Sequence, residues 1–258
     1  MINVLNSFNS ERKTICFVHG FMESSAVWNT ASKAFSDRFN CVALSLPGHF
    51  KSEENPCFDD IYELLSRWKQ VLDTHQISTC HFVAHSMGAY LAAAFKARFP
   101  EHAEQVVVIN STLLPDTKQQ SKQRALFAKL SPTKFELLSV LAFQKYNSLN
   151  CYSVDYIESK TRFAQNLNPK HLIHLQQSIA KRKDLSELLN LYSEDFYFIF
   201  SEKDEEVPWQ AQIKKWPSLN HTILKNQSHL LPEDTKFWTN LVLDFFCKKT
   251  SPNQNLGR

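Results

Sequence analysis

The feature that most constrains this 258-residue chain is a serine, Ser86, that stands between a strand pattern and a helix pattern. The run Cys80 to Ala84 is apolar and β-prone, and the alanine-rich run Ala89 to Arg98 has helical character. Small residues, Ala84 and Gly88, stand two positions before and two positions after the serine. This pattern is typical of a nucleophile elbow, a sharp turn at which strand and helix pass too close for large side chains. The sequence therefore predicts a strand–turn–helix unit with a serine exposed at its turn.

The same serine could instead be an ordinary N-cap at the start of a helix. The rest of the chain favours the elbow, because further short apolar runs end in loops that carry polar residues. These runs are Thr14 to Val18, Cys41 to Leu46, Gln105 to Ile109 and Phe196 to Ser201. Apolar runs that alternate with helical stretches predict an α/β fold, a mostly parallel sheet flanked by helices.

Five short motifs stand in an order that resembles the α/β-hydrolase superfamily, from about residue 13 to residue 248. They are His19-Gly20-Phe21, Leu46-Pro47-Gly48-His49, Ala84-His85-Ser86-Met87-Gly88, Lys203-Asp204 with Val207-Pro208, and Ser228-His229. Within the superfamily the chain looks most similar to the small, lidded serine esterases and C–C hydrolases. The resemblance implies the α/β-hydrolase fold, with a helical lid inserted after the sixth strand of the sheet.

The chain departs from the family pattern at several turns, and it has only four glycines. The family usually has glycine where this chain has Ala84, Ser201 and Ser228, and often Asp and Gly where it has Ser45 and Phe50. One small residue in place of another leaves the catalytic interpretation intact. A phenylalanine in place of glycine is harder to accommodate, so the shape of the loop at Phe50 is left open.

The resemblance and the chemistry of an unactivated hydroxyl together give a candidate triad of Ser86, His229 and Asp204. A serine is a poor nucleophile at neutral pH and needs a base within hydrogen-bond reach. His229 lies in the loop after the last expected strand, which is the family's position for the base. Its far nitrogen needs a carboxylate, and Asp204 follows the run 196–201 at the family's position for the acid.

Other acids near these positions are alternatives for the third member. Glu202, Glu205 and Glu206 surround Asp204, where they would otherwise form a solvated acidic loop, and Asp116 follows an earlier strand at a greater distance. None of the ten histidines is paired with Asp, Glu or Cys at metal-ligand spacing. We therefore expect no metal and no cofactor.

Backbone N–H groups are the expected oxyanion donors. The resemblance assigns them to Phe21, after the His-Gly pair, and to Met87, after the serine. The residues beside these motifs, Met22, His19 and His85, are expected to line the pocket.

The segment between the run that ends at Ile109 and the run that begins at Phe196 has no strand pattern. It is too long for a bare loop in a compact domain. Its apolar residues recur at helical spacing, as at Leu126, Phe127 and Leu130. We expect four or five short helices, with new helices able to begin at Pro132 and Pro169.

These patterns predict the division of the chain. The α/β core comprises residues 1–110 and 193–249, the lid comprises residues 111–192, and residues 250–258 form a flexible tail. The opening hairpin of the family is reduced, at most to the single run Ile2 to Phe8.

The expected lid is basic. Residues 111–190 contain 12 Lys and Arg against 6 Asp and Glu, in a chain of net charge +3. This asymmetry could steer an anionic ester, or an acyl group on a carrier protein or coenzyme A, towards the serine. The alternative is a solvated helix face that keeps the protein soluble. Nucleic acid is not an expected partner, because the basic residues are not interleaved with exposed aromatics.

The cysteines, the first residues and the apolar segments indicate where in the cell the protein is expected. The six cysteines have no Cys-x-x-Cys spacing, and Cys16, Cys41 and Cys80 lie in expected buried strands, where free thiols are favoured. The first residues lack a continuous apolar run, and no segment reaches the roughly 18 apolar residues that span a bilayer. We expect a cytoplasmic protein without a membrane span. The sequence gives no indication of its oligomeric state.

A serine nucleophile points to acyl transfer to water through an acyl-enzyme. We expect a carboxylic-ester hydrolase that acts on small to medium, largely apolar acyl chains. Two alternatives remain. One is a C–C bond hydrolase or a menaquinone-pathway-type lyase with the same triad, and the other is a hydrolase-fold ligand receptor with negligible turnover.

Overall fold

A mostly parallel sheet forms the centre of the molecule. The computed structural model describes residues 2–49, 60–148, 158–159, 162–164 and 166–248, so the loop at Phe50 and the tail 250–258 lie outside the described residues. The strands are β1 (Ile2–Val4), β2 (Thr14–Val18), β3 (Asn40–Leu44), β4 (Cys80–His85), β5 (Ala103–Ile109), β6 (Phe196–Ser201) and β7 (His221–Leu224). In the described part of the chain they form one sheet in the order β1-β3-β2-β4-β5-β6-β7. β1 is antiparallel to β3 and the other pairs are parallel.

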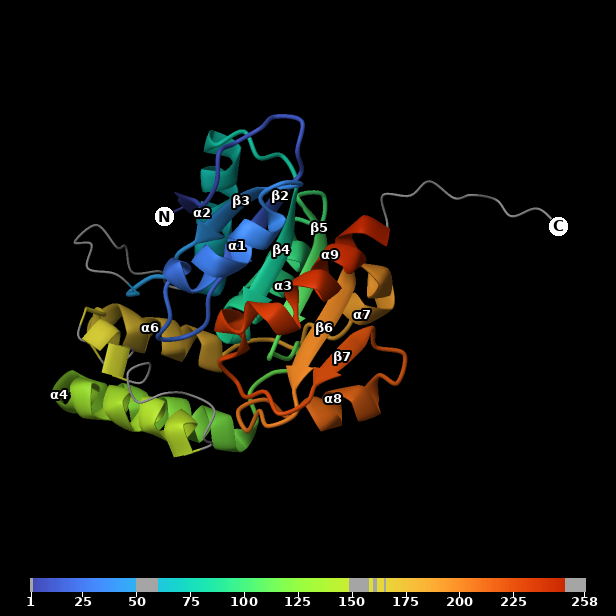
Figure 1. Ribbon diagram of the computed structural model, residues 1–258. Helices are drawn as coiled ribbons and strands as arrows, with labels where there is room; N and C mark the ends of the chain where they lie inside the picture. Colours follow the sequence, from blue (N-terminus) through green and yellow to red (C-terminus); the bar gives the residue numbers. More distant parts are fainter. Residues whose placement is uncertain (1, 50–59, 149–157, 160–161, 165, 249–258) are drawn as a thin grey trace.

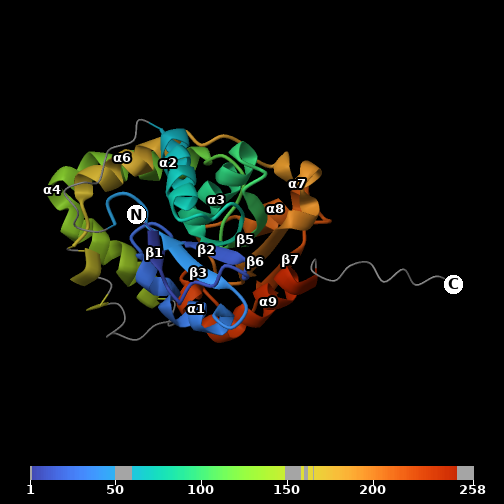
Figure 2. The same cartoon turned by 90° about the horizontal axis from the view of Figure 1, so that it is seen from above.

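Helices cover both faces of this sheet. They are α1 (Asn29–Phe35), α2 (Ile61–Thr74), α3 (Ser86–Arg98), α4 (Lys118–Ser148), α6 (Pro169–Ala180), α7 (Leu188–Leu191), α8 (Trp209–Lys215) and α9 (Thr239–Lys248), with short 3₁₀ turns at Ser25–Trp28, Ser193–Asp195, Leu231–Glu233 and Thr235–Phe237. Seen from above, α1 and α9 lie on one side of the sheet and α2 and α3 on the other (Figure 2).

Both sheet faces are apolar because side chains alternate along each strand. In β2, Ile15 and Phe17 pack into the apolar cluster on the α1 and α9 side, and Cys16 and Val18 pack into the cluster on the α2 and α3 side. The predicted α/β fold with a mostly parallel sheet flanked by helices is confirmed.

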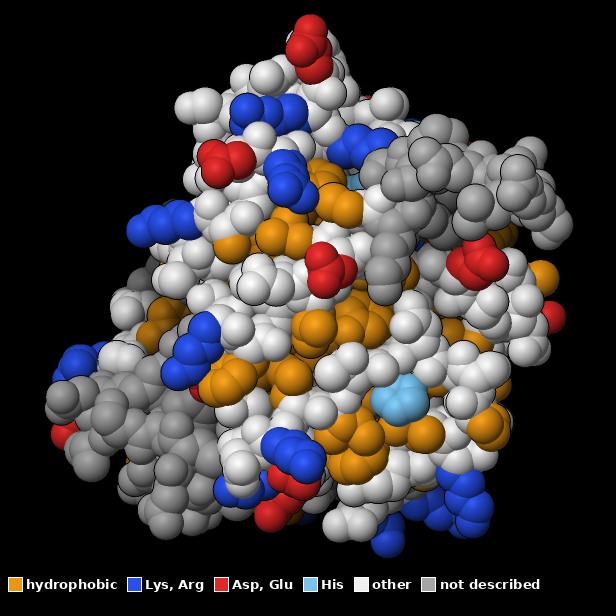
Figure 3. All heavy atoms as spheres, turned by 45° about the vertical axis from the view of Figure 1, so that its right-hand side comes forward, with side chains coloured by type: hydrophobic (Ala, Val, Ile, Leu, Met, Phe, Trp, Pro, Cys, Tyr) orange, Lys and Arg blue, Asp and Glu red, His pale blue; other side chains and the backbone are white. Residues whose placement is uncertain are grey.

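On the outer face that Figure 3 brings forward, hydrophobic side chains lie in several groups among polar and charged ones.

The N-terminal part of the sheet is smaller than expected. β1 is limited to Ile2–Val4, and Ile2 pairs with Leu44 of β3. A single strand precedes β2, so the helical insertion follows β5, which is the fifth strand along the chain. The predicted position after the sixth strand is corrected accordingly.

The helices between β5 and β6 are α4, α6 and α7, with further helical residues at 158–159 and 162–164 in the described part of the chain. α4 consists of two helices joined at a kink just after Pro132, at which Lys134 has non-helical φ and ψ of −132° and 22°. α6 does begin at Pro169, and its N-cap Asn168 accepts a hydrogen bond from the backbone N–H of His171. α4 and α6 lie side by side at one end of the molecule (Figures 1 and 2).

A glycine connects this insertion to the core. Gly48, in the loop after β3, has a φ of +79°, and a Cβ there would lie 2.9 Å from the Cβ of His171 in α6. Its carbonyl accepts a hydrogen bond from the backbone N–H of Asn168 at 2.9 Å. The start of α6 is therefore held against the loop at the carboxyl end of β3.

The cysteines predicted to lie in strands are buried and free, namely Cys16, Cys41 and Cys80. Burial raises the pKa of the Cys41 thiol to about 12, so this thiol stays protonated at neutral pH. Within the described ranges, no helix combines the length and the apolar character that crossing a membrane requires.

Candidate active site

The serine turn joins β4 to α3 at the middle of the sheet. Ser86 has a φ of 49°, a left-handed conformation that is strained for a residue with a side chain. A Cβ on Gly88 would lie 2.3 Å from the carbonyl oxygen of His19 and 2.8 Å from that of Val18. Ala84, on the strand side, is fully buried. The small residues around the serine are thus required by the close approach of α3 to the end of β2.

Three side chains from three separate loops meet at the carboxyl edge of the sheet. Nε2 of His229 lies 2.9 Å from Oγ of Ser86, and Nδ1 of His229 lies 2.9 Å from Oδ2 of Asp204. The second carboxylate oxygen of Asp204 accepts hydrogen bonds from the backbone N–H groups of Glu206, at 2.8 Å, and Val207, at 3.2 Å. Both Asp204 and His229 are buried. The structure therefore brings together the serine, histidine and aspartate that the sequence singled out.

The alternative acids lie elsewhere. The carboxylate of Glu202 accepts a hydrogen bond from the backbone N–H of Asn226, and Glu205 is exposed. Asp116 forms ion pairs with Arg124 and Arg182. None of these three carboxylates contacts the His229 ring through a hydrogen bond or ion pair within the described residues.

Opposing effects set the pKa of His229. Burial lowers the pKa, but the charge and hydrogen bond of Asp204, together with the charges of Glu206 and Glu23, outweigh burial and raise it above its ordinary value of 6.5. The Nδ1–H of the ring donates to Asp204, so a neutral ring leaves Nε2 as an acceptor for the serine hydroxyl proton.

A second histidine–carboxylate pair lies beside this group, and the sequence reasoning missed its acid. Nε2 of His85 donates to the backbone carbonyl of His229 at 2.8 Å, and Nδ1 lies 2.9 Å from Oε2 of Glu23. The same oxygen of Glu23 accepts the backbone N–H of Gly20 at 2.6 Å. One proton must lie between the ring nitrogen and the carboxylate, so the pair as a whole is neutral. It connects the loop after β2 to the loop that carries His229.

Asn110, after β5, fixes the same loop from the other side. Its side-chain amide donates to the carbonyl of His229 at 2.9 Å, the carbonyl of Ser228 at 3.1 Å and Oγ of Ser201 at 2.9 Å. Its own φ is 45°. An asparagine tolerates this conformation better than most residues do. Side chains that are far from His229 in the sequence therefore hold the loop that carries it.

The loop after β2 is held by buried histidines. Nε2 of His19 accepts the N–H of Leu46 at 3.0 Å, and Nε2 of His49 accepts the N–H of Met22 at 2.9 Å. Burial, together with the nearby His19, lowers the pKa of His49 to about 3, so its ring is a neutral acceptor. His19 is completely buried behind the loop and is not among the residues that line the cavity, in contrast to our expectation.

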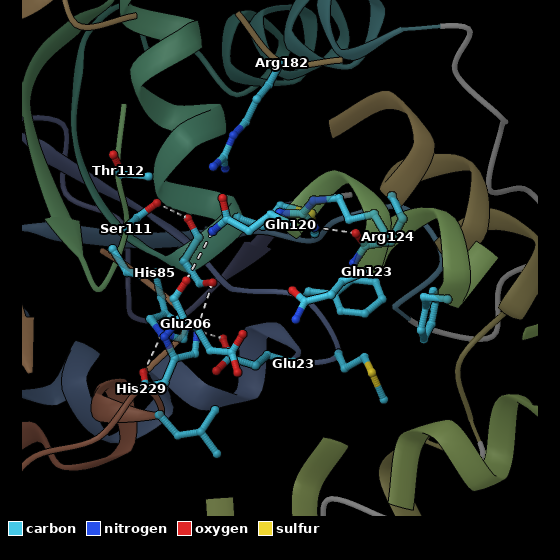
Figure 4. A pocket seen from close by; sticks show the side chains of 18 residues that line it. Glu23, His85, Ser111, Thr112, Gln120, Gln123, Arg124, Arg182, Glu206 and His229 are labelled. Carbon is cyan, nitrogen blue, oxygen red and sulfur yellow. Dashed lines mark hydrogen bonds and ion pairs between the residues drawn. The ribbon is translucent and has the colours of Figure 1, made fainter. Parts of the chain in front are cut away.

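A cavity of about 360 Å³ opens in front of the serine. The expected pocket residues Met22 and His85 line it, as do Phe21 and Met87, whose N–H groups are the expected oxyanion donors. Its remaining wall comes from the loops at the sheet edge and from the insertion (Figure 4). The lining residues there are Glu23, Ser111, Thr112, Gln120, Gln123, Arg124, Phe127, Gln176, Arg182, Glu206, Val207 and Leu230.

Among the residues that the structure describes, no group of three or more His, Cys, Asp or Glu side chains is arranged to hold a metal ion. The His229 and Asp204 side chains beside Ser86 suit proton transfer to and from a hydroxyl.

Comparison with known proteins places these features in a wider family. The family model described as the alpha/beta hydrolase fold matches residues 13–242. Among curated proteins, the chain is similar to the "Serine hydrolase-like protein" of Danio rerio, with 29% identity over 102 residues, which cover 39% of this chain and 31% of that protein. The match thus spans about a third of the length of this curated relative.

Solved structures match over nearly the whole chain. A carboxylesterase of the thaumarchaeon Nitrososphaera gargenis has a TM-score of 0.80 and 12% identity, with coverage of 97% of this chain and 94% of the other. MenH from S. aureus has a TM-score of 0.79 and 15% identity, with coverage of 97% and 98%. At these identities the likeness shows the fold alone.

Proposed function

The chain belongs to the alpha/beta hydrolase fold family, and we propose that it is a serine hydrolase that cleaves carboxylic esters of small to medium acyl chains. The single observation that carries this proposal is the connected series Ser86 Oγ, His229 and Asp204, with 2.9 Å at each step. A serine in such a series has a base for its proton, and the base has a carboxylate that fixes its tautomer.

In the first half of the reaction, Oγ of Ser86 attacks the ester carbonyl carbon while Nε2 of His229 takes the hydroxyl proton. The carbonyl electron pair moves to the oxygen, which the backbone N–H groups of Phe21 and Met87 stabilise. Collapse of this intermediate breaks the bond to the alcohol oxygen, and His229 returns the proton to that oxygen. Asp204 stays ionised and stabilises the imidazolium.

In the second half, water takes the place of the serine hydroxyl. His229 removes a proton from the water as its oxygen attacks the acyl carbon. The second intermediate then releases the acid and returns the proton to Ser86. This sequence needs no metal and no cofactor.

The insertion acts as a lid in this proposal, with residues 111–192 as the lid and residues 1–110 and 193–249 as the core. Two contacts support the assignment. The side-chain amide of Gln120 donates to the backbone carbonyl of Glu206, next to the loop of Asp204, and the ring of Phe127 packs edge-on against Phe21 at 5.4 Å. The oxyanion loop and the acid loop are therefore both in contact with α4.

The test is labelling and turnover of Ser86→Ala. Loss of the nucleophile in a serine protease costs on the order of 10⁶-fold in kcat, so we expect no measurable hydrolysis of p-nitrophenyl esters and no labelling by a fluorophosphonate. Ser66→Ala is the matched control, because this serine lies in α2 and, within the described residues, its hydroxyl bonds the carbonyl of Tyr62 in the same helix. Residual activity above a trace in purified Ser86→Ala would place the nucleophile elsewhere. Labelled Ser86 without turnover of any ester would favour a ligand receptor or a different scissile bond.

A further inference from the structure

Two arginines of the insertion lie in the cavity wall, and the reaction described above does not use them. Arg124 lies in α4 and Arg182 follows α6, and both line the cavity. The Arg182 side chain is only 5% exposed and that of Arg124 21%. Figure 4 shows both guanidinium groups on the side of the cavity that lies away from His229.

These two arginines share a single carboxylate. Oδ2 of Asp116 lies 2.6 Å from Nε of Arg124, and Oδ1 lies 3.0 Å from Nη2 of Arg182. The Asp116 side chain is only 1% exposed. Among the described residues, two guanidinium groups against one carboxylate leave one positive charge in this cluster, because arginine stays protonated at neutral pH.

The remaining acids of the lining, Glu23 and Glu206, lie near the triad (Figure 4). Glu23 is paired with His85, and Glu206 stands next to the Asp204 loop, where its charge acts on His229. A buried charge without a counter-charge is costly. An anionic group of a ligand would therefore be favoured at the arginine end of the cavity.

Arg182 is the arginine with unused hydrogen-bonding capacity. Arg124 directs Nε and Nη2 to Asp116 and Nη1 to the side-chain oxygen of Gln176. The guanidinium of Arg182 lies over the ring of Tyr90, 5.2 Å from its centroid, and its Nε is buried with no hydrogen-bond partner among the described residues. The guanidinium is a planar fork, which suits a carboxylate.

The orientation of the bound ester in the cavity follows from the reaction. His229 must return a proton to the leaving alcohol, so the alcohol oxygen lies on the His229 side of Ser86. The acyl chain then extends to the other side, where Arg182 and Arg124 lie (Figure 4). The side-chain amides of Gln120 and Gln123 line the same part of the cavity and can donate further hydrogen bonds.

We propose that Arg182, supported by Arg124 and Asp116, forms a carboxylate subsite that binds an ionised carboxyl group at the far end of the acyl chain. The preferred substrates are then half-esters of dicarboxylic acids. This inference rests on the proposed ester hydrolysis for its substrate class, but the carboxylate subsite itself can be tested without turnover.

The kinetic test compares two esters of equal acyl length, p-nitrophenyl hemiglutarate, which is anionic at neutral pH, and p-nitrophenyl valerate, which is neutral. We expect the native protein to have the higher kcat/KM on the hemiglutarate. Hydrogen bonds to a charged group typically contribute enough for a 10- to 100-fold change in binding. Arg182→Gln should therefore lose roughly 10- to 100-fold in kcat/KM on the hemiglutarate, mainly through KM, and much less on the valerate.

Two variants separate this subsite from general charge and from folding. Lys122→Gln removes an exposed cation of α4, the helix that also carries Arg124, and should not remove the preference for the hemiglutarate. Arg182→Lys keeps the charge without the planar fork and should retain part of the preference. Valerate hydrolysis reports whether Arg182→Gln is folded, because that substrate does not need the subsite.

Calorimetric titration with glutarate gives the readout that does not depend on activity. Glutarate should bind the native protein and Ser86→Ala, and its affinity should fall in Arg182→Gln. Equal kcat/KM on both esters in the native protein, or equal losses on both in Arg182→Gln, would overturn the subsite. If no ester is turned over while glutarate still binds through Arg182, the ester hydrolysis fails and the carboxylate site stands.

Discussion

Gly88 shows how the packing around one residue can outweigh helix propensity. The residue lies inside α3, where alanine is ordinarily favoured over glycine by about 1 kcal/mol. A Cβ there would lie 2.3 Å from a backbone oxygen at the end of β2, which cannot rotate away as a side chain can. Overpacking of a core typically costs roughly 1–3 kcal/mol. We expect Gly88→Ala to lower the midpoint of urea unfolding and to reduce esterase activity, because it displaces the neighbouring N–H of Met87. A raised midpoint would show that helix propensity decides at this position.

The dependence of kcat/KM on pH is expected to follow the charges around His229. Hydrolysis needs the neutral ring, so kcat/KM should rise with pH through the His229 pKa, which lies above its ordinary value of 6.5. The charge of Glu206 contributes to this raised pKa. Glu206→Gln should therefore move the rising limb of the profile to lower pH. The matched control is Glu202→Gln in the same loop, whose carboxylate bonds Asn226 and should leave the limb in place. A limb that moves upwards in Glu206→Gln would contradict this electrostatic account.

The sequence indicated the residues of the candidate site that belong to local motifs, and it missed those that depend on long-range contacts. Ser86, Asp204 and His229 each stand in a short motif, and the structure brings them together. Glu23 acts through His85, 62 positions away, and Asn110 through the carbonyl of His229, 119 positions away. No periodicity connects such partners. The only local signal for Glu23 was a carboxylate in an otherwise apolar glycine loop.

At the scale of elements, the contact between α4 and the loop after β2 sets the size of the cavity. Phe127 lines the cavity and packs against Phe21, whereas its neighbour Leu126 is 56% exposed. Phe127→Ala should enlarge the cavity and shift the best p-nitrophenyl ester towards longer acyl chains. Leu126→Ala removes a side chain of similar size from the solvent side of the same helix turn and should leave the optimum where it is. An unchanged optimum in Phe127→Ala would mean that α4 does not bound the acyl chain.

The strands of the core were better predicted than the helices of the insertion. β2 and β6 were predicted residue for residue, because a buried parallel strand is a short apolar run with clear ends. In the insertion, Pro132 was expected at a helix start, and the two helices of α4 meet at a kink at Lys134, two residues after it. Leu126, Leu137 and Leu141 have helical spacing, yet each is more than half exposed. Periodicity identifies a helix face, but it does not say whether another element covers that face.

For the whole molecule, the alternation of apolar runs and helices was enough to predict the fold class, and the motifs were enough to indicate the carboxyl edge of the sheet. The insertion follows the fifth strand rather than the sixth, because one strand, β1, precedes β2. The basic residues of the segment 111–190 form two components, one buried and one exposed. Arg124 and Arg182 are tied to a buried carboxylate, whereas Lys122 is exposed and Arg162 forms an exposed ion pair with Glu158. Lys160 lies outside the described residues.

These two components predict different responses to salt. The Debye length falls from about 30 Å at 0.01 M to about 10 Å at 0.1 M salt, which weakens steering by exposed cations but acts much less on buried ones. Where encounter limits the rate, kcat/KM for the hemiglutarate ester should fall with added salt more than kcat/KM for the valerate ester. Lys122→Gln should flatten this dependence on salt without removing the preference, whereas Arg182→Gln should remove the preference and keep the slope. If both esters respond equally to salt, the exposed basic residues of α4 are a solvated face and do not steer the substrate. The carboxylate subsite is still tested by the preference between the two esters and by the titration with glutarate.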